Sequence, residues 1–147
     1  MIDRSNDSME KTGRHTLVVP IRFADIDGLN HVNNAVYLTY IESARIKYFN
    51  EVIGESIDWN KKGIILASAS INFKVPVELA DEEVIVSTWC SNIGTKSFEL
   101  SYSIVNSKTK AIAAEASTTM VCFNYSEKRT IEMPELWKEK IKSYEQS

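Results

Sequence analysis

A polar stretch at residues 25–34 combines side chains that could perform acid–base or nucleophilic chemistry. It reads Asp25-Ile26-Asp27-Gly28-Leu29-Asn30-His31-Val32-Asn33-Asn34. A carboxylate such as that of Asp27 can activate water or attack a carbonyl carbon. If a helix begins at Asn34, its free backbone N–H groups suit an oxygen that becomes negative during such a reaction. The stretch therefore holds a candidate base or nucleophile and a candidate oxyanion donor.

His31 lies between these two positions and is a third catalytic candidate. A single histidine in a loop is more often a hydrogen-bonded structural residue than a base. The stretch contains neither serine nor cysteine, which excludes a Ser-His or Cys-His nucleophile within it. The chemistry proposed for this stretch therefore rests mainly on Asp27.

Two other interpretations of the stretch need no catalysis. In the first, Asn33 or Asn34 caps the following helix and the residues before them form a turn. In the second, the oxygens that alternate along residues 25–30 bind calcium. An EF-hand loop requires glycine at its sixth position and glutamate at its twelfth, where this chain has Asn30 and Val36. No metal site is therefore expected, whereas spacing alone leaves capping and catalysis open.

The stretch lies between a predicted strand and a predicted helix. Residues 17–23 read as a strand, in which Pro20 indicates an edge position or a bulge. In residues 34–53, apolar and aromatic side chains recur every three or four positions, and Gly54 follows as a C-cap, which predicts a long helix. The first charged side chain of this helix is Glu42, which indicates that protein covers its first half on nearly all sides.

After this helix the hydrophobic period changes to two, which predicts antiparallel strands. The alternating runs occupy residues 65–73, 83–90, 96–106 and 111–124. Turn-forming residues at 92–94 and 106–109 join the last three runs as hairpins. A short helix is predicted from Pro134, where proline suits the first turn. Residues 1–14 lack hydrophobic periodicity and are predicted to be a frayed tail.

These elements predict a single α+β domain over residues 15–147. A helix that is apolar on most faces and a sheet with one apolar face pack economically when the sheet curls around the helix. We therefore predict a hot-dog fold, in which an antiparallel sheet wraps around one long central helix. The sheet edges and part of the helix would stay open, which predicts a homodimer or homotetramer.

Composition excludes several functional classes. The formal net charge of −3 on 147 residues gives no general attraction for nucleic acid or for an anionic membrane surface. The two cysteines, Cys90 and Cys122, lack metal-ligand spacing and are too few for a disulfide scaffold, so buried free thiols are expected. No run of apolar residues reaches transmembrane length, and the N-terminus has no signal-like segment. We expect a cytoplasmic protein without nucleic-acid or membrane partners.

Three motifs give the chain a family likeness. They are Phe23-Ala24-Asp25-Ile26-Asp27, His31-Val32-Asn33-Asn34-Ala35-Val36-Tyr37 and Tyr40-x-Glu42-x-x-Arg45. Together they resemble the signature of hot-dog-fold acyl-CoA thioesterases of the 4-hydroxybenzoyl-CoA thioesterase type. The likeness extends over about residues 16–133 and includes Phe73-Lys74-x-Pro76 at a strand end. It implies hydrolysis of an acyl-CoA to a free acid, with coenzyme A as the leaving group and no metal or redox cofactor.

The resemblance also implies roles for individual residues. The family's catalytic carboxylate is the second aspartate of Asp-x-Asp, which falls on Asp27. The family's oxyanion donor is a backbone N–H at the start of the central helix, which falls on Asn34. Many relatives have glycine before His31, whereas this chain has Asn30, a residue that can also adopt the left-handed conformation. General-base and mixed-anhydride routes both remain open.

Substrate contacts are expected at three further positions. Tyr37 ends the second motif, and Lys96 and Ser97 are similar to a Lys-Ser-Phe segment that lies near the coenzyme A phosphates in some members. The alternative for Lys96 is an exposed lysine after a turn, with no ligand.

Three rival functions share parts of this pattern. A hot-dog hydratase or dehydratase works with a histidine and an acid across a dimer interface, and His31 is a candidate for that histidine. A non-catalytic acyl-CoA-binding protein would keep the fold, although it has little reason to hold Asp27 beside a thioester. Plant acyl-carrier-protein thioesterases share a similar Asp-x-x-x-His-Val-Asn-Asn stretch but have asparagine where this chain has Leu29.

Overall fold

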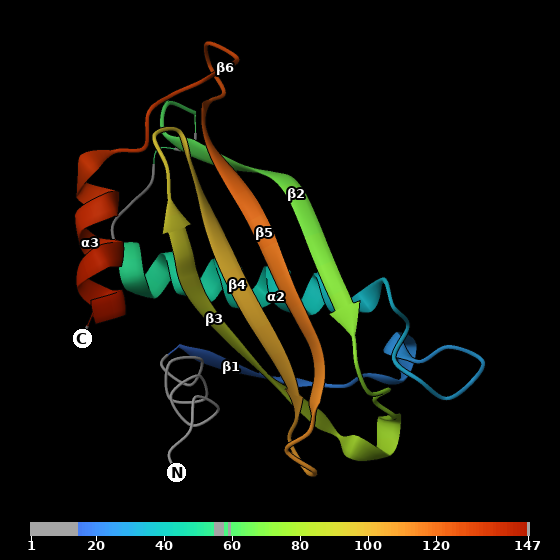
Figure 1. Cartoon of the computed structure of the whole chain (residues 1–147). Coiled ribbons are helices and arrows are strands. Elements are labelled where there is room, and N and C mark those ends of the chain that lie inside the picture. The colour runs from blue at the N-terminus through green and yellow to red at the C-terminus, as the bar shows by residue number, and fades with distance from the viewer. Residues whose placement is uncertain (1–14, 55–57, 59, 147) are drawn as a thin grey trace.

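The computed structural model describes residues 15–54, 58 and 60–146. A six-stranded antiparallel sheet curls around one long helix, α2, as Figure 1 shows. The strand order is β1-β3-β4-β5-β2, and β6 pairs with β5. This is the α+β hot-dog arrangement that the sequence predicted. The predicted tail at residues 1–14 lies outside the described residues.

The strands and helices follow the order that the hydrophobic periodicity indicated. The strands are β1 (Thr16–Pro20), β2 (Gly63–Phe73), β3 (Glu83–Ile93), β4 (Ser97–Asn106), β5 (Ile112–Asn124) and β6 (Arg129–Thr130). The helices are η1 (Phe23–Asp25), α2 (Val36–Tyr48), η2 (Phe49–Ile53), η3 (Leu79–Asp81) and α3 (Glu135–Gln146). The short strand β6 carries no periodic signal and was not predicted.

The long central helix ends where the sequence predicted but begins two residues later. α2 continues directly into the π-helical turn η2, and Gly54 closes it with a φ of 71° in the left-handed region. The predicted start at Asn34 is early, because Asn34 and Ala35 form a turn before the first helical residue. No local sequence feature predicted the π-helical turn.

The core lies between α2 and the concave face of the sheet. The alternating residues of β4, namely Phe98, Leu100, Tyr102 and Ile104, are all buried. On the helix, Ile41, Ala44 and Tyr48 are buried. Both cysteines are buried free thiols, as predicted. The C-terminal helix α3 begins directly after Pro134 and buries Trp137 and Ile141.

The strand predicted for residues 17–23 is shorter in the structure. β1 ends at Pro20, and Phe23 opens the 3-10 helix η1 with 83% of its surface exposed. The chain turns here because the backbone N–H of Arg22 donates to the Asp25 carboxylate. In a strand, this N–H would donate to a neighbouring strand instead. β1 is an edge strand, as Pro20 indicated.

One flank of the molecule remains open in the single chain. β2 forms the second edge of the sheet, and its residues from Leu66 to Phe73 are mostly exposed. The first half of α2 is not covered on nearly all sides, because Leu38 on this helix is 44% exposed. Within the described residues, no helix is long and apolar enough to cross a membrane.

Candidate functional site

Residues 25–33 form a small hairpin that connects η1 to α2. At its base, the Asn33 N–H donates a hydrogen bond to the carbonyl oxygen of Asp25 at 2.8 Å. Nearer the tip, the Asp27 N–H donates to the carbonyl oxygen of His31, also at 2.8 Å. The residues between these two hydrogen bonds form an antiparallel bridge. These hydrogen bonds fix the position of Asp27 relative to the start of α2.

The tip of the hairpin depends on Asn30 in the left-handed conformation, with a φ of 66°. Asparagine tolerates this region better than most residues that carry a side chain. The Asn30 N–H donates to the Asp27 carbonyl oxygen at 3.1 Å, which closes the turn. On the other side, the Val32 N–H donates to the Val77 carbonyl oxygen at 2.8 Å and attaches the hairpin to the segment after β2.

The Asp27 carboxylate is oriented by backbone amides. Its Oδ1 accepts hydrogen bonds from the Leu29 N–H at 2.8 Å and the His31 N–H at 3.2 Å. Its Oδ2 makes no hydrogen bond to any of the described residues. Because both amides bind Oδ1, Oδ2 is left to accept a proton or to attack a carbonyl carbon.

The start of α2 presents one unpaired amide. The Asn33 side-chain Oδ1 accepts the Ala35 N–H at 2.9 Å, and the Asn33 carbonyl oxygen accepts the Val36 N–H at 2.9 Å. The Asn34 N–H makes no hydrogen bond within the described parts of the chain. Neither asparagine is the N-cap of α2, which is Ala35 without a side-chain cap hydrogen bond; Asn33 accepts the Ala35 amide in the turn before the helix, and the amide of Asn34 stays available to a ligand.

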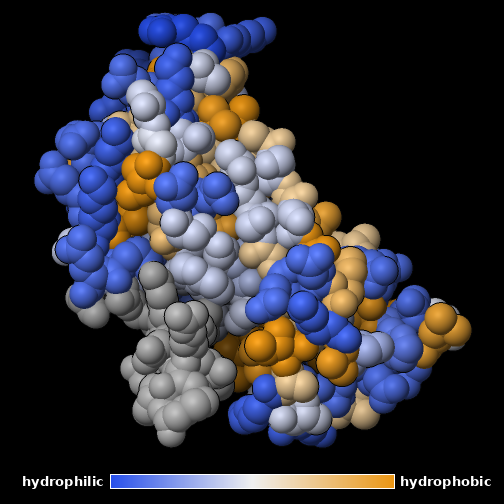
Figure 2. Space-filling view, viewed as in Figure 1, coloured by the Kyte–Doolittle hydropathy of each residue, from blue (hydrophilic) through white to orange (hydrophobic). Residues whose placement is uncertain are grey.

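These groups share one pocket of about 340 Å³. Four predicted site residues line it, namely Asp27, His31, Asn34 and Tyr37. The end of β2 and the segment after it also line the pocket, with Phe73, Lys74, Val75 and Pro76. Figure 1 shows that the end of β2 and the start of α2 lie at the same end of the molecule. Figure 2 shows apolar surface interspersed with hydrophilic side chains over this end.

Tyr37 forms an apolar wall of this pocket. Its ring lies edge to face against that of Phe73, with ring centroids 5.3 Å apart. The residue is only 2% exposed, and burial raises the pKa of its hydroxyl, which therefore remains a proton donor. That hydroxyl makes no hydrogen bond to the residues that the structure describes. The His31 imidazole also lines the pocket and likewise has no hydrogen-bond partner in the described chain.

Lys96 and Ser97 are not brought to this pocket within one chain. They lie at the turn between β3 and β4, whereas the hairpin follows β1, whose Pro20 pairs with Glu83 at the other end of β3. The 11 residues of β3 span about 35 Å at about 3.3 Å per residue. Any contact of Lys96 or Ser97 with a ligand in the Asp27 pocket would have to come from another subunit.

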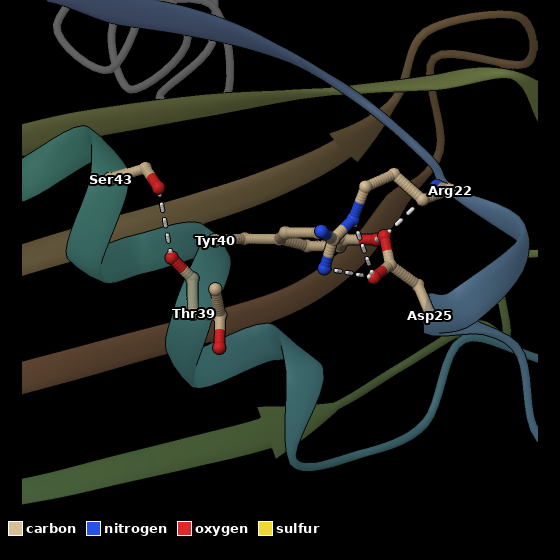
Figure 3. Close-up of polar contacts among 5 residues, drawn as sticks. All are labelled: Arg22, Asp25, Thr39, Tyr40 and Ser43. Carbon is tan, nitrogen blue, oxygen red and sulfur yellow. Dashed lines mark hydrogen bonds and ion pairs between the residues drawn. The ribbon is translucent and has the colours of Figure 1, made fainter.

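Sequence reasoning missed the surroundings of the other aspartate in the hairpin. Figure 3 shows the Asp25 carboxylate beside Arg22 and at the end of the Tyr40 side chain. Oδ1 of Asp25 accepts hydrogen bonds from Arg22 Nε at 3.2 Å and Nη2 at 2.9 Å. Oδ2 accepts the Arg22 backbone N–H at 2.9 Å and the Tyr40 O–H at 2.8 Å. The positions of Asp25 and Tyr40 in the family motifs were the only signal available beforehand.

This arrangement keeps Asp25 ionised. Burial alone would raise the pKa of the carboxyl group, but the hydrogen bonds from Arg22 and Tyr40 outweigh burial and hold the pKa of Asp25 below its ordinary value. Asp25 is 1% exposed, so both its oxygens are occupied and shielded from solvent. Among the two aspartates of the hairpin, Asp27 lines the pocket and Asp25 does not.

In the described residues, no group of three or more histidine, cysteine, aspartate or glutamate side chains is arranged to hold a metal ion. The chemistry available in the pocket is that of a carboxylate, a backbone amide at a helix N-terminus, an imidazole and a phenol.

Known proteins resemble this chain over most of its length. It is 26% identical over 126 residues to the long-chain acyl-CoA thioesterase FadM of Escherichia coli (strain K12), across 84% of this chain and 93% of FadM. A thioesterase from Thermus thermophilus, crystallised with coenzyme A and Zn, is 30% identical with a TM-score of 0.78, across 91% of this chain and 96% of its own. A 1,4-dihydroxy-2-naphthoyl-CoA thioesterase from Synechocystis shares the fold at 23% identity, with a TM-score of 0.76 over 86% of this chain and 94% of its own.

The family match includes the hairpin, α2 and strands β2 to β6. The sequence model of the thioesterase-like superfamily matches residues 21–141. The relatives agree with the thioester hydrolase and the hot-dog fold that the motifs indicated. By its motifs, its fold and this match, the chain belongs to the thioesterase-like superfamily.

Proposed function

We propose that this protein is an acyl-CoA thioesterase that hydrolyses a thioester to a free carboxylic acid and coenzyme A. One observation carries the proposal: the Asp27 carboxylate and the unpaired N–H of Asn34 line the same pocket. FadM and the Thermus thermophilus protein are named as thioesterases, and the latter was crystallised with coenzyme A, which supports an acyl-CoA substrate here.

In this mechanism the thioester carbonyl oxygen accepts the Asn34 N–H and lies at the positive end of α2. The N-terminal charge of the helix stabilises the negative charge that this oxygen gains in the tetrahedral intermediate. Asp27 either removes a proton from the attacking water or attacks the carbonyl carbon to form a mixed anhydride that water then opens. In both routes the carbon–sulfur bond breaks, and the thiolate of coenzyme A leaves and takes up a proton.

The other pocket residues fit an acyl group. Leu29, Tyr37, Phe73 and Val75 line the pocket and provide apolar surface near Asp27. The Tyr37 hydroxyl contributes a hydrogen-bond donor to an otherwise apolar wall. His31 is assigned a role in contacting the substrate or moving a proton, secondary to that of Asp27.

The active form is a homodimer or homotetramer. β2 leaves its outer edge unpaired, and Leu66 at 46% and Ile46 at 54% exposure form part of the apolar flank on which β2 and α2 meet. An open strand edge beside exposed apolar side chains is a surface that proteins normally cover. A second copy of the chain, related by a two-fold axis, covers this flank and pairs its own β2 antiparallel to the first.

Such pairing brings Lys96 of the partner subunit toward the pocket. Within one chain, Gly63 at the start of β2 pairs with Phe123, and the neighbouring Cys122 N–H donates to the Lys96 carbonyl oxygen at 2.9 Å. Lys96 therefore lies near the start of β2. Antiparallel pairing places the start of one β2 beside the end of the other, where Phe73 lines the Asp27 pocket. The partner's Lys96 and the partner's Ser97 can then contact the coenzyme A portion of the substrate.

Thiol release from a panel of aliphatic and aromatic acyl-CoAs tests the reaction, and Asp27→Asn tests the mechanism. The substitution preserves shape but cannot accept a proton or attack, so kcat on the preferred substrate should fall about 10²- to 10⁴-fold with little change in KM. Formation of the free acid is followed in parallel by mass spectrometry.

Asp81→Asn is the matched control for this substitution. Asp81 also accepts a backbone N–H, that of Glu78 at 2.8 Å, but it lies in η3 and does not line the pocket. Asp25→Asn is unsuitable as a control because it would remove the charge that pairs with Arg22 and replace one of the two oxygens that accept four hydrogen bonds. Wild-type turnover in folded Asp27→Asn, or no thiol release from any acyl-CoA, would contradict the proposed function.

A further inference from the structure

The Asp25 clamp, defined as Arg22, Asp25 and Tyr40, joins the hairpin to the central helix. Arg22 and Asp25 lie at the turn that opens the hairpin, whereas Tyr40 lies on α2. The Tyr40 hydroxyl donates to Asp25 Oδ2 across this gap at 2.8 Å, and Figure 3 shows the ring reaching from the helix to the carboxylate. Among the described residues, Tyr40 is the only side chain of α2 that hydrogen-bonds to residues 21–33.

Asp25 also anchors both strands of the hairpin. Its own backbone begins the strand that leads to Asp27, and its carbonyl oxygen accepts the N–H of Asn33 at 2.8 Å. Asn33 is followed directly by Asn34, which lines the pocket. Asp25 is therefore linked along the chain to Asp27, the proposed catalytic carboxylate, and through Asn33 to Asn34, the proposed oxyanion donor. Tyr40 holds Asp25 against α2.

We propose that Tyr40 and Asp25 are positioning residues that set the distance between Asp27 and the Asn34 amide, although neither touches the substrate. This inference rests on the proposed function. Asp25 is 1% and Tyr40 3% exposed, and within the described residues neither lines the Asp27 pocket. Breaking the bond between them leaves α2 and the sheet in place but frees the hairpin to shift relative to the helix.

Tyr40→Phe tests the clamp because it removes one hydroxyl and keeps the buried ring. Misplacement of reacting groups by about 1 Å can cost about 10²-fold in rate, so a partial shift should lower kcat by about 10- to 100-fold. KM should change little, because the walls of the pocket are untouched. Hydrogen exchange at the amides of Asp27, Asn30, Val32 and Asn33 should become faster, because the hairpin opens more often.

Tyr48→Phe is the matched control. Tyr48 lies near the other end of α2, is fully buried, and donates its hydroxyl to the Glu145 carboxylate at 2.6 Å. Tyr48→Phe therefore removes a tyrosine–carboxylate hydrogen bond of the same type from the same helix, far from the hairpin. This variant should be destabilised about as much as Tyr40→Phe but should keep the wild-type kcat and the wild-type exchange in residues 26–33.

A double substitution separates failure of the clamp from failure of the proposed function. If the clamp acts through Asp27, Tyr40→Phe should lower kcat much less in the Asp27→Asn background than in the wild type. Equal kcat for Tyr40→Phe and Tyr48→Phe, with Asp27→Asn slow, would overturn the clamp alone. Unchanged hairpin exchange in Tyr40→Phe would overturn it as well. Wild-type turnover in Asp27→Asn would instead overturn the proposed function, and the exchange measurement would still decide whether the clamp holds the hairpin.

Discussion

The rings of Tyr37 and Phe73 meet edge to face with centroids 5.3 Å apart, which joins the start of α2 to the end of β2. This contact forms one wall of the pocket and links two segments that are 36 residues apart in the sequence. Tyr37 is buried, and its hydroxyl has no partner in the described chain. The ring should therefore contribute to stability, whereas removal of the hydroxyl alone should change stability little.

Tyr37→Phe keeps the ring, so its free energy of unfolding should stay close to that of the wild type. Tyr37→Ala should lose about 3–5 kcal/mol, as is usual when a large aromatic side chain is removed from a core. Urea denaturation measures both values. A rise in KM for Tyr37→Phe without loss of stability would indicate that the hydroxyl binds substrate, whereas a large loss of stability in this variant would contradict the assignment of an unpartnered hydroxyl.

Asn33 and Asn34 should respond differently to alanine substitution. Asn33→Ala removes the side-chain acceptor of the Ala35 N–H and should lower the free energy of unfolding by about 1 kcal/mol, the usual net value of one hydrogen bond. Asn34→Ala removes a side chain that caps nothing in the described structure, so it should keep stability and most of its turnover. Loss of kcat in Asn34→Ala as deep as that in Asp27→Asn would show that the Asn34 side chain, and not its amide, takes part in the reaction.

Acid unfolding should report the ion pair between Asp25 and Arg22. Folding lowers the pKa of Asp25, so the unfolded chain binds the proton more tightly than the folded chain. The stabilising contribution is complete above the ordinary pKa of aspartate, about 3.9, and is lost as pH falls from there through the lowered pKa of the folded state. The free energy of unfolding, measured with urea at a series of pH values, should therefore decrease over this window.

Asp25→Asn should flatten this pH dependence. At neutral pH it should also lower stability by about 2 kcal/mol, because hydrogen bonds to a charged group are each worth about 1.5–3 kcal/mol and Arg22 is free to return to solvent. The same slope in Asp25→Asn and wild type would assign the acid sensitivity to other carboxylates.

Ile46→Lys tests the proposed subunit contact. Ile46 is 54% exposed on α2, so lysine should be tolerated in an isolated chain but should place an unpaired charge in a dimer interface. We expect light scattering to show a dimer or tetramer for the wild type and a smaller, less active species for Ile46→Lys. Val18→Lys is the control, since Val18 is 50% exposed on β1 at the opposite edge of the sheet. A fully active wild-type monomer would contradict the proposed assembly.

Local signals in the sequence determined most of the elements. The helical period of residues 34–53, the left-handed Gly54 and the alternation of Phe98 through Ile104 all reflect interactions with near neighbours, and each matches the structure. The hot-dog class followed, because one apolar helix and one half-apolar sheet have few ways to bury their surfaces. The motifs also identified Asp27, His31, Asn34 and Tyr37, which the structure gathers in one pocket.

Tertiary structure decided the features that depend on residues far apart in the chain. The turn after Pro20 joins Arg22 to Asp25, and Tyr40 of α2 completes this site from 15 residues further along the chain, a contact that no local propensity reports. The end of β2 became a pocket wall only through the fold. Conversely, the length of β3, about 35 Å, separates Lys96 and Ser97 from the end of the sheet that the hairpin follows. The sequence could not predict this separation, because a motif gives the type of a residue and not its distance from another element.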